Sequence, residues 1–319
     1  REQVRAREHE YRRSSGNAHM TNGIHVAVMT SAAVLHLQPR ENGRYIDATL
    51  GAGTHTEELL KASSPNGRVL SIDANPLALE KSRAALSSYG KRWIGVEANF
   101  RNLESVAKEN GFAPCDGILF DLGFSSDELA DPSKVLSIMV NGPLDMRLGP
   151  SANEDGLTAA EIVNGWSRDE IEEIVRTYGE ERYSRKIADE IVAARSKARL
   201  IGTLDLASVI RSAVPRSYER GRIHPATRTF QALRIAVNDE LNALRDAIKG
   251  ARAILSPGAR VVIISFHSLE DRIVKQAFRD AEDLNVITKK PLIPTEEEIS
   301  FNPRSRSAKM RVGEKVSSE

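Results

Sequence analysis

Between residues 44 and 121, apolar and polar positions alternate in blocks that are typical of an α/β sheet. Short apolar runs predict four strands, at 44–49, 67–73, 93–98 and 117–121. Apolar residues at helical spacing predict helices between them, at 56–62 and 76–88. Strands separated by helices favour a parallel, doubly wound sheet, which binds ligands beyond the carboxyl ends of its strands. Asp47, Asp73 and Asp121 stand at or near those ends.

The alternation then gives way to charged, helical sequence from about 159 to 213, where Thr158 and Glu161 have the spacing of a capping box. A long helix is expected from 227 to 255, with an apolar stripe that includes Phe230 and Ile248. The strongest strand follows at 259–266, then a helix at 269–281 and two weak strands at 286–288 and 308–312. We therefore expect one Rossmann-like α/β domain interrupted by a helical insertion at about 130–225.

Composition sets wide limits on the function. The chain of 319 residues has a net charge of +1, which neither requires nor excludes a nucleic-acid partner. Its one cysteine, Cys115, excludes a disulfide framework, and an inert packed thiol is expected. No apolar run reaches the ~20 residues of a membrane span. A soluble protein is expected, and the start at Arg1 suggests a chloroplast stroma or mitochondrial matrix, with the bacterial cytoplasm as the alternative.

The loop from Asp47 to His55 predicts a cofactor site. Gly51 and Gly53 let the backbone approach a ligand closely, and the following helix presents free N–H groups. A dinucleotide site would have a third glycine where Thr56 stands, which argues against NAD. S-adenosylmethionine suits the loop better, with Asp73 on the ribose hydroxyls. The alternative is that Asp47 and Asp73 only cap helices.

A second candidate site follows the fourth strand, in the sequence Asp121-Leu122-Gly123-Phe124. Methyltransferases that act on exocyclic amines place an acidic or amide motif with an aromatic residue here. A carboxylate that accepts N–H bonds can align the weakly nucleophilic amine, and an aromatic ring can stack on the base. His267 and His55 are candidate proton acceptors or ligand contacts, with a helix-capping or structural role as the alternative; the loop position of His55 favours the ligand.

Four longer motifs give the chain a specific resemblance: Gly142-Pro143-Leu144-Asp145-Met146-Arg147, Thr177-Tyr178-Gly179-Glu180-Glu181, the run from His224 to Ala232, and the run from Ser265 to Arg272. In this order they resemble the ribosomal small-subunit methyltransferase H family, also called MraW, from about residue 25 to residue 312. The resemblance implies N4-methylation of a cytidine in the decoding region of small-subunit ribosomal RNA, with S-adenosylmethionine as donor. It also implies a class I methyltransferase domain at 25–130 and 225–319, a substrate-recognising helical insertion at 131–224 and a charged extension at 1–24.

The resemblance also implies site residues by position. The cofactor contacts would be Gly51, Gly53, Thr54, His55, Asp73, Phe100, Asp121 and Glu128. The family usually has glycine where Thr54 stands and glutamine where Glu128 stands, and an ionised carboxylate cannot donate as an amide does. The candidate catalytic set, taken from the residues themselves, is Asp121, Phe124, Asp145, Arg147 and His267, with Phe124 standing where the family is expected to have an aliphatic residue.

Some charged residues keep two interpretations. Arg147 could bind phosphate or orient Asp121, or form a buried structural ion pair with Asp145. A basic rim for RNA or a solvated face could be formed by Arg216, Arg220, Arg222, His224 and Arg228, and by Arg304 and Arg306.

The whole-chain alternatives are an amino-methyltransferase that acts on DNA, another RNA or a small molecule, and a nonenzymatic ribosome-assembly factor. The expected partner is small-subunit ribosomal RNA in a subunit or an assembly intermediate. The sequence leaves a monomer and a homodimer equally open.

Overall fold

The computed structural model describes residues 27–123, 138, 140–153, 155–215, 217–218 and 224–317. Contacts within the chain divide it into two compact units. The first comprises residues 1–125 and 242–319, and the second comprises residues 126–241.

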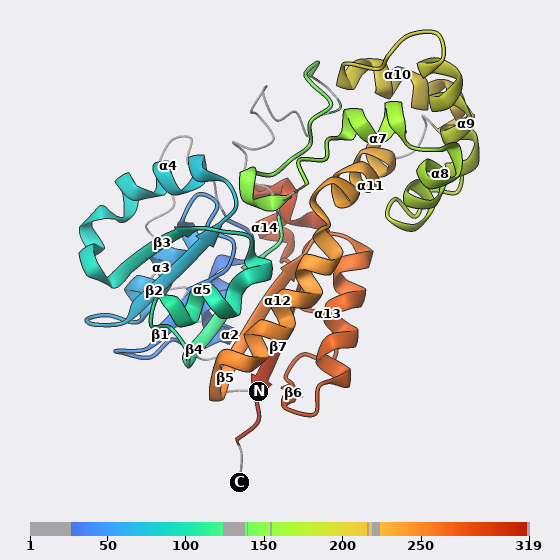
Figure 1. Ribbon diagram of the computed structural model, residues 1–319. Helices are drawn as coiled ribbons and strands as arrows, with labels where there is room; N and C mark the ends of the chain where they lie inside the picture. Colours follow the sequence, from blue (N-terminus) through green and yellow to red (C-terminus); the bar gives the residue numbers. More distant parts are fainter. Residues whose placement is uncertain are drawn as a thin grey trace. The chain divides into compact units, whose positions relative to one another are not determined.

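A seven-stranded sheet forms the centre of the first unit, in the order β3-β2-β1-β4-β5-β7-β6 (Figure 1). The strands are β1 (Arg44–Asp47), β2 (Arg68–Asp73), β3 (Trp93–Glu97), β4 (Cys115–Asp121), β5 (Leu255–Ser265), β6 (Leu284–Val286) and β7 (Lys309–Lys315). β1 to β5 are mutually parallel, whereas β7 runs antiparallel to both β5 and β6. The sheet expected from the sequence is therefore confirmed as parallel over five strands, and its last two strands reverse direction.

Helices cover both faces of this sheet. One layer contains α2 (Thr30–Leu37), α3 (Thr54–Ala62) and α4 (Pro76–Leu86), and the other contains α5 (Leu103–Glu109), α12 (Glu240–Ile254) and α13 (Ser268–Asp280). Short helical segments η1 (Ser87–Arg92), η2 (Phe100–Asn102), α14 (Glu296–Phe301) and η5 (Pro303–Ser307) join them.

The two layers are built from alternate residues of the same strands. Ile118 and Phe120 of β4 pack with α5, α12 and α13, while Leu119 between them packs with α2, α3 and α4. Successive side chains of a strand point to opposite faces, so a strand with helices on both sides must be apolar throughout. This explains the continuous apolar runs of the sequence. Cys115 is buried here without a disulfide, as expected, and burial raises the pKa of its thiol to about 12.

The second unit is helical over its described residues. It contains η3 (Pro150–Ala152), α7 (Ala159–Gly165), α8 (Arg168–Thr177), α9 (Ser184–Arg195), α10 (Thr203–Ala213) and α11 (Thr227–Asn238) around a core of its own. The capping box predicted at Thr158 and Glu161 is present, and a second one opens α8 at Ser167 and Glu170.

The single long helix expected at 227–255 is wrong. Asp239, with φ 46°, adopts the left-handed conformation and separates α11 from α12. α11 packs with α7 and α8, so it belongs to the helical unit. That unit ends at residue 241, whereas the second methyltransferase segment was expected to start at residue 225. The helices α2, α5 and α14 were also missed, and β5 begins at Leu255, four residues before the strand expected at 259–266.

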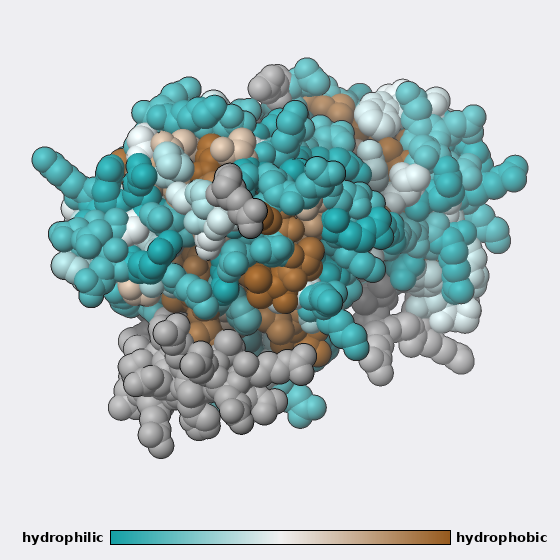
Figure 2. Space-filling model, turned by 90° about the horizontal axis from the view of Figure 1, so that it is seen from below, coloured by the Kyte–Doolittle hydropathy of each residue, from teal (hydrophilic) through white to brown (hydrophobic). Residues whose placement is uncertain are grey.

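The described surface is mainly hydrophilic. Figure 2 shows one face of the molecule, on which apolar patches are separated by polar side chains. Among the described residues, no helix is long and apolar enough to cross a membrane.

Candidate active site

The glycine-rich loop joins β1 to α3 at the carboxyl edge of the sheet. Gly51 and Gly53 have φ values of 51° and 80°, a backbone region that side chains other than glycine rarely adopt. A Cβ atom on Gly51 would have nothing within 4 Å, whereas one on Gly53 would lie 3.1 Å from Ser82 Oγ. The loop therefore has open space beside Gly51 and is packed closely against α4 at Gly53.

Asp73 connects this loop to the end of β2. One carboxylate oxygen accepts the N–H of Gly51 at 2.9 Å, and the other accepts the N–H of Asn75 at 2.8 Å. Asn75, and not Asp73, caps α4. A carboxylate offers about four acceptor positions, so a group fixed in this way can also accept hydrogen bonds from two ribose hydroxyls.

Asp47 lies beneath the loop and is fully buried. Its carboxylate accepts the Thr49 N–H at 3.2 Å and the Thr56 hydroxyl at 2.6 Å. Thr56 has one hydroxyl proton, so Ser71 must donate to Thr56 Oγ1, at 2.7 Å, and Trp93 Nε1 donates to Ser71 at 3.1 Å. Burial raises the pKa of Asp47 to about 6, against the lowering effects of His55 and of these hydrogen bonds. Asp47 therefore organises the loop from below and caps no helix.

His55 and Asp121 are brought together by α3 and β4. His55 Nε2 lies 3.2 Å from Asp121 Oδ2, and the side chain of His55 is 4% exposed. Burial alone would lower the pKa of His55, but the hydrogen bond to Asp121 and the charges of Asp121, Asp47 and Glu58 together raise it. The expected loop position of His55 is wrong, since it lies in the first turn of α3. Its Nδ1 atom has no hydrogen-bond partner among the described residues.

Hydrogen bonds hold the backbone of Asp121 as well as its side chain. Its N–H donates to Thr49 Oγ1 at 2.7 Å, and its Oδ1 accepts the Gly123 N–H at 3.3 Å. A Cβ atom on Gly123 would lie 2.7 Å from the ring of Phe266, so a larger residue there would displace that ring. Thr49 was missed by the sequence analysis, although a hydroxyl inside a cofactor loop was a signal that could have drawn attention to it.

Two predicted cofactor contacts have simple structural surroundings. Thr54 is the first residue of α3, and Phe100 lies in η2, where its ring meets that of Phe120 edge to face with 6.2 Å between the centroids. Phe100 is partly exposed just beyond β3, which is the strand next to β2 and Asp73.

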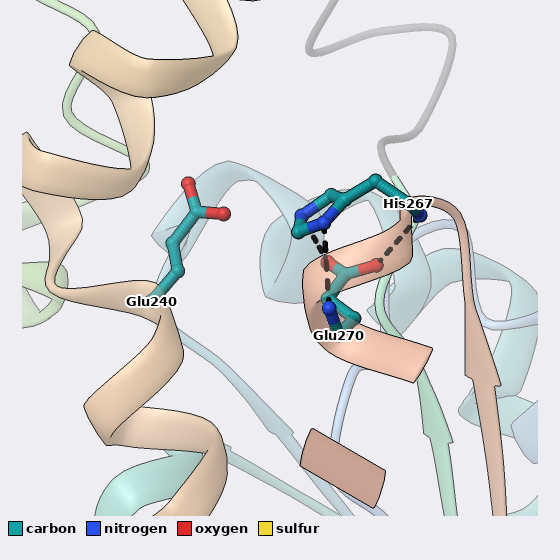
Figure 3. Close-up of side chains that lie close together, drawn as sticks. All are labelled: Glu240, His267 and Glu270. Carbon is teal, nitrogen blue, oxygen red and sulfur yellow. Dashed lines mark hydrogen bonds and ion pairs between the residues drawn. The ribbon is translucent and has the colours of Figure 1, made fainter. Parts of the chain in front are cut away.

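His267 caps α13, which confirms the capping alternative. Its Nδ1 accepts the Glu270 N–H at 3.4 Å, and the Glu270 carboxylate accepts the N–H of His267 (Figure 3). The same carboxylate accepts the N–H of Phe266 at 2.8 Å. His267 Nε2 is 3.1 Å from Glu270 Oε1, which is within ion-pair distance, but it makes no hydrogen bond to any described residue. The capping box therefore explains why both His267 and Glu270 occur in the run from Ser265 to Glu270.

Asp145 and Arg147 form a bidentate salt bridge within the second unit. Arg147 Nε and Nη2 each donate to one Asp145 oxygen at 2.7 Å. The two side chains are 41% and 27% exposed, for Arg147 and Asp145 respectively, so the alternative of a buried structural pair is wrong. The hydrogen bond to Asp145 raises the pKa of Arg147, which keeps it charged.

The remaining candidates are placed as follows. His224 Nδ1 accepts the Ala226 N–H at 3.1 Å, and Arg228 donates to the carbonyl oxygen of Glu180. Arg304 and Arg306 are exposed on η5. Several predicted residues lie outside the described part of the chain: Phe124, Glu128, Arg216, Arg220 and Arg222.

Comparison with known proteins decides the family. The sequence pattern of the MraW methylase family matches residues 22–316. The chain belongs to this family. It is 46% identical to the ribosomal RNA small subunit methyltransferase H of Thermomicrobium roseum, over 92% of this chain and 94% of that one. It is 48% identical to the protein of the same name from Synechococcus elongatus, over 92% and 95% of the two chains. A member of the MraW methylase family is an enzyme of methyl transfer.

Proposed function

We propose that this chain transfers the methyl group of S-adenosylmethionine to N4 of a cytidine in the decoding region of small-subunit ribosomal RNA. The arrangement that supports this best is the pair formed by His55 and Asp121 beside the glycine loop. The curated relatives are named for methylation of the same RNA. S-adenosylmethionine supplies an electrophilic methyl group on a sulfonium, so the protein must mainly bind, orient and exclude water.

The residues around the loop fit this cofactor. Open space beside Gly51 gives access to the backbone, and Asp73 presents a fixed carboxylate suited to two neighbouring hydroxyls. Gly53, Thr54 and His55 would contact the methionine end, Phe100 would lie beside the adenine, and Glu128 would complete the set. Thr56 stands where a dinucleotide site would have glycine and is fully buried against Asp47, which disfavours NAD.

Asp121 would act on the acceptor. An exocyclic amine is a weak nucleophile because its lone pair is delocalised into the ring. A carboxylate that accepts one of its N–H bonds turns that lone pair toward the methyl group. Thr49, Gly123 and His55 hold Asp121 at three atoms, so the carboxylate is aligned before the substrate binds. His55 therefore acts through Asp121, as a positioning residue.

The further catalytic candidates have different positions in this scheme. Arg147, whose geometry is fixed by Asp145, would contact RNA phosphate, and Phe124 would stack on the base. His267 would stabilise the start of α13 at the edge where β5 ends. Residues 131–224 would recognise the RNA within a small subunit or an assembly intermediate. The organellar location stays a prediction.

Methylation of RNA in vitro tests the proposal. Small-subunit ribosomal RNA that lacks the modification is incubated with the protein and S-adenosylmethionine, and its nucleosides are analysed by mass spectrometry. We expect N4-methylcytidine. A methyl group on another nucleoside would refute the N4 assignment, and unmodified RNA, both free and in small subunits, would refute the function.

The Asp121→Asn variant tests the proposed role of the carboxylate. We expect kcat to fall by about a hundredfold or more, because the amine loses its aligned acceptor, while cofactor affinity stays within a few-fold. Asp116→Asn is the matched control: its carboxylate also accepts a backbone N–H, from Arg44 at 2.8 Å, but Asp116 lies near the opposite end of β4. Equal activity of the two variants would move the chemistry away from Asp121.

A further inference from the structure

The segment between β6 and β7 returns to the sheet at the edge that carries Asp121. Lys309 pairs with Ser265 at the carboxyl end of β5, and one residue earlier on that strand Ile264 pairs with Asp121. Neighbouring strands are about 4.8 Å apart, so β7 begins about 10 Å from the row of Asp121. Residues 301–309, named here the basic turn, therefore lie at the same edge as the proposed acceptor site.

The basic turn is firmly anchored. Ser305 is fully buried, and both its N–H and its hydroxyl donate to the carbonyl oxygen of Asn302, at 3.0 and 2.8 Å. Asn302 N–H in turn bonds to the Glu298 carbonyl, while the Glu298 side chain accepts the N–H of Met29 at 2.6 Å. Because Ser305 is held inside, Arg304 and Arg306 on either side of it are exposed.

Positive charge exceeds negative charge at this turn. Arg311 and Lys309 share a single carboxylate, Asp271, at 2.6 and 3.3 Å, and Arg304 and Arg306 add two more cations. The three glutamates of α14 lie in its first turn, one helical turn before the basic turn, and residues 301–309 themselves hold Arg304, Arg306 and Lys309 without an acidic residue. Phe301, the last residue of α14, is 65% exposed, so its ring is open to solvent beside the two arginines.

We infer that the basic turn is a docking surface for the RNA strand that flanks the target cytidine. This inference rests on the proposed function. A base presented to Asp121 leaves its neighbours and their phosphates running along the same edge of the sheet. Arginine side chains bind such phosphates with a fixed, forked geometry, and an exposed aromatic ring stacks on an unpaired base whatever its identity. The basic turn offers both within a few residues.

The test measures RNA binding without turnover. An unmethylated transcript of the small-subunit RNA is titrated with protein saturated with S-adenosylhomocysteine, over a series of salt concentrations. We expect the Arg304→Gln/Arg306→Gln double variant to bind about tenfold more weakly, with a salt slope lower by about 1.4 to 1.8 for two lost phosphate contacts. Phe301→Ala should weaken binding by about fivefold or more with little change in slope.

The matched control is Lys275→Gln/Arg279→Gln, which removes the same charge from exposed positions on α13. That helix starts at the Asp121 edge, and Arg279 lies about 16 Å further along it. The control should bind as the parent protein does, and the double variant should methylate saturating RNA at the parental kcat with a raised KM. If the double variant and the control bind equally well while the parent protein methylates RNA, the docking inference fails alone. If the parent protein neither binds nor methylates the RNA, the proposed function fails with it.

Discussion

Asp47 shows how a buried carboxyl group can organise a cofactor loop. Its two oxygens hold Thr49 and Thr56, and the chain of donors from Trp93 through Ser71 ends on the same group. Thr49 then holds the backbone of Asp121, so the bottom of the loop and the end of β4 are one connected network. From the sequence, the aspartates could be identified as strand-end residues, but the network around Asp47 could not, because its members come from the glycine loop, from α3 and from the strands β2 and β3.

This burial predicts a specific dependence of stability on pH. The pKa of Asp47 is about 6 in the folded protein and about 3.9 in an unfolded chain. The folded state therefore binds more protons in this range, and the free energy of unfolding falls by about 2 kcal/mol as the pH rises from 4 to 6. Asp47→Asn removes the titrating group at nearly the same size, although its amide nitrogen replaces one acceptor oxygen, and the variant should lose that fall.

Urea unfolding at pH 4, 5 and 6 measures the difference between the parent protein and the variant. Titrating groups that do not interact with Asp47, such as Asp271 with its lowered pKa, are common to both proteins and cancel, whereas His55 is coupled to Asp47 and contributes to the difference. Parallel stability curves would contradict the assignment.

Asp73 should control cofactor affinity. A hydrogen bond to a charged group contributes about 1.5–3 kcal/mol, so loss of the carboxylate in Asp73→Ala should weaken S-adenosylmethionine binding by about ten- to a hundredfold. Calorimetry measures the affinity, and Asp116→Ala again serves as the control because it removes a carboxylate that accepts a backbone N–H near the opposite end of β4. Unchanged affinity in Asp73→Ala would remove the ribose role.

At the scale of elements, the break between α11 and α12 is the clearest feature that the sequence concealed. The apolar stripe continues through it at helical spacing, without proline or glycine at the break. Phe230, Leu233 and Val237 nevertheless pack in the helical unit, and Leu244 and Ile248 pack against the sheet. Periodicity reports which face is buried, but it does not report which core buries it.

Asp239 makes this break possible, and its conformation can be tested. Aspartate tolerates the left-handed region, whereas a β-branched residue clashes there, at a cost of about 1–2 kcal/mol. Asp239→Val should therefore lower the free energy of unfolding by about that amount. Asp239→Asn should stay within about 0.5 kcal/mol of the parent protein in urea unfolding. Equal stability of the two variants would show that the left-handed turn is not needed.

At the scale of the whole molecule, the sequence predicted the class of fold because strands covered on both faces leave an unmistakable apolar signature. It also located the glycine-rich loop, in which Gly51 and Gly53 adopt positive φ values, while the contacts of that loop with the cofactor stay a prediction. It failed where a short segment depends on distant partners. α14 is an example, because its Glu298 side chain is held by the N–H of Met29, and β6, which pairs with β7, begins two residues before the strand expected at 286–288. The same holds for His55, whose role depends on Asp121, a residue 66 positions away.

β7 is the last strand along the chain, yet it lies inside the sheet, between β5 and β6. During synthesis the other strands leave the ribosome first, so one edge of β5 has no pairing strand until β7 has been made. An open edge of this kind is prone to pairing with other chains. Chains that end before residue 309 would therefore expose a defect that chaperones and proteases recognise, and the cell would distinguish finished from unfinished enzyme by one strand.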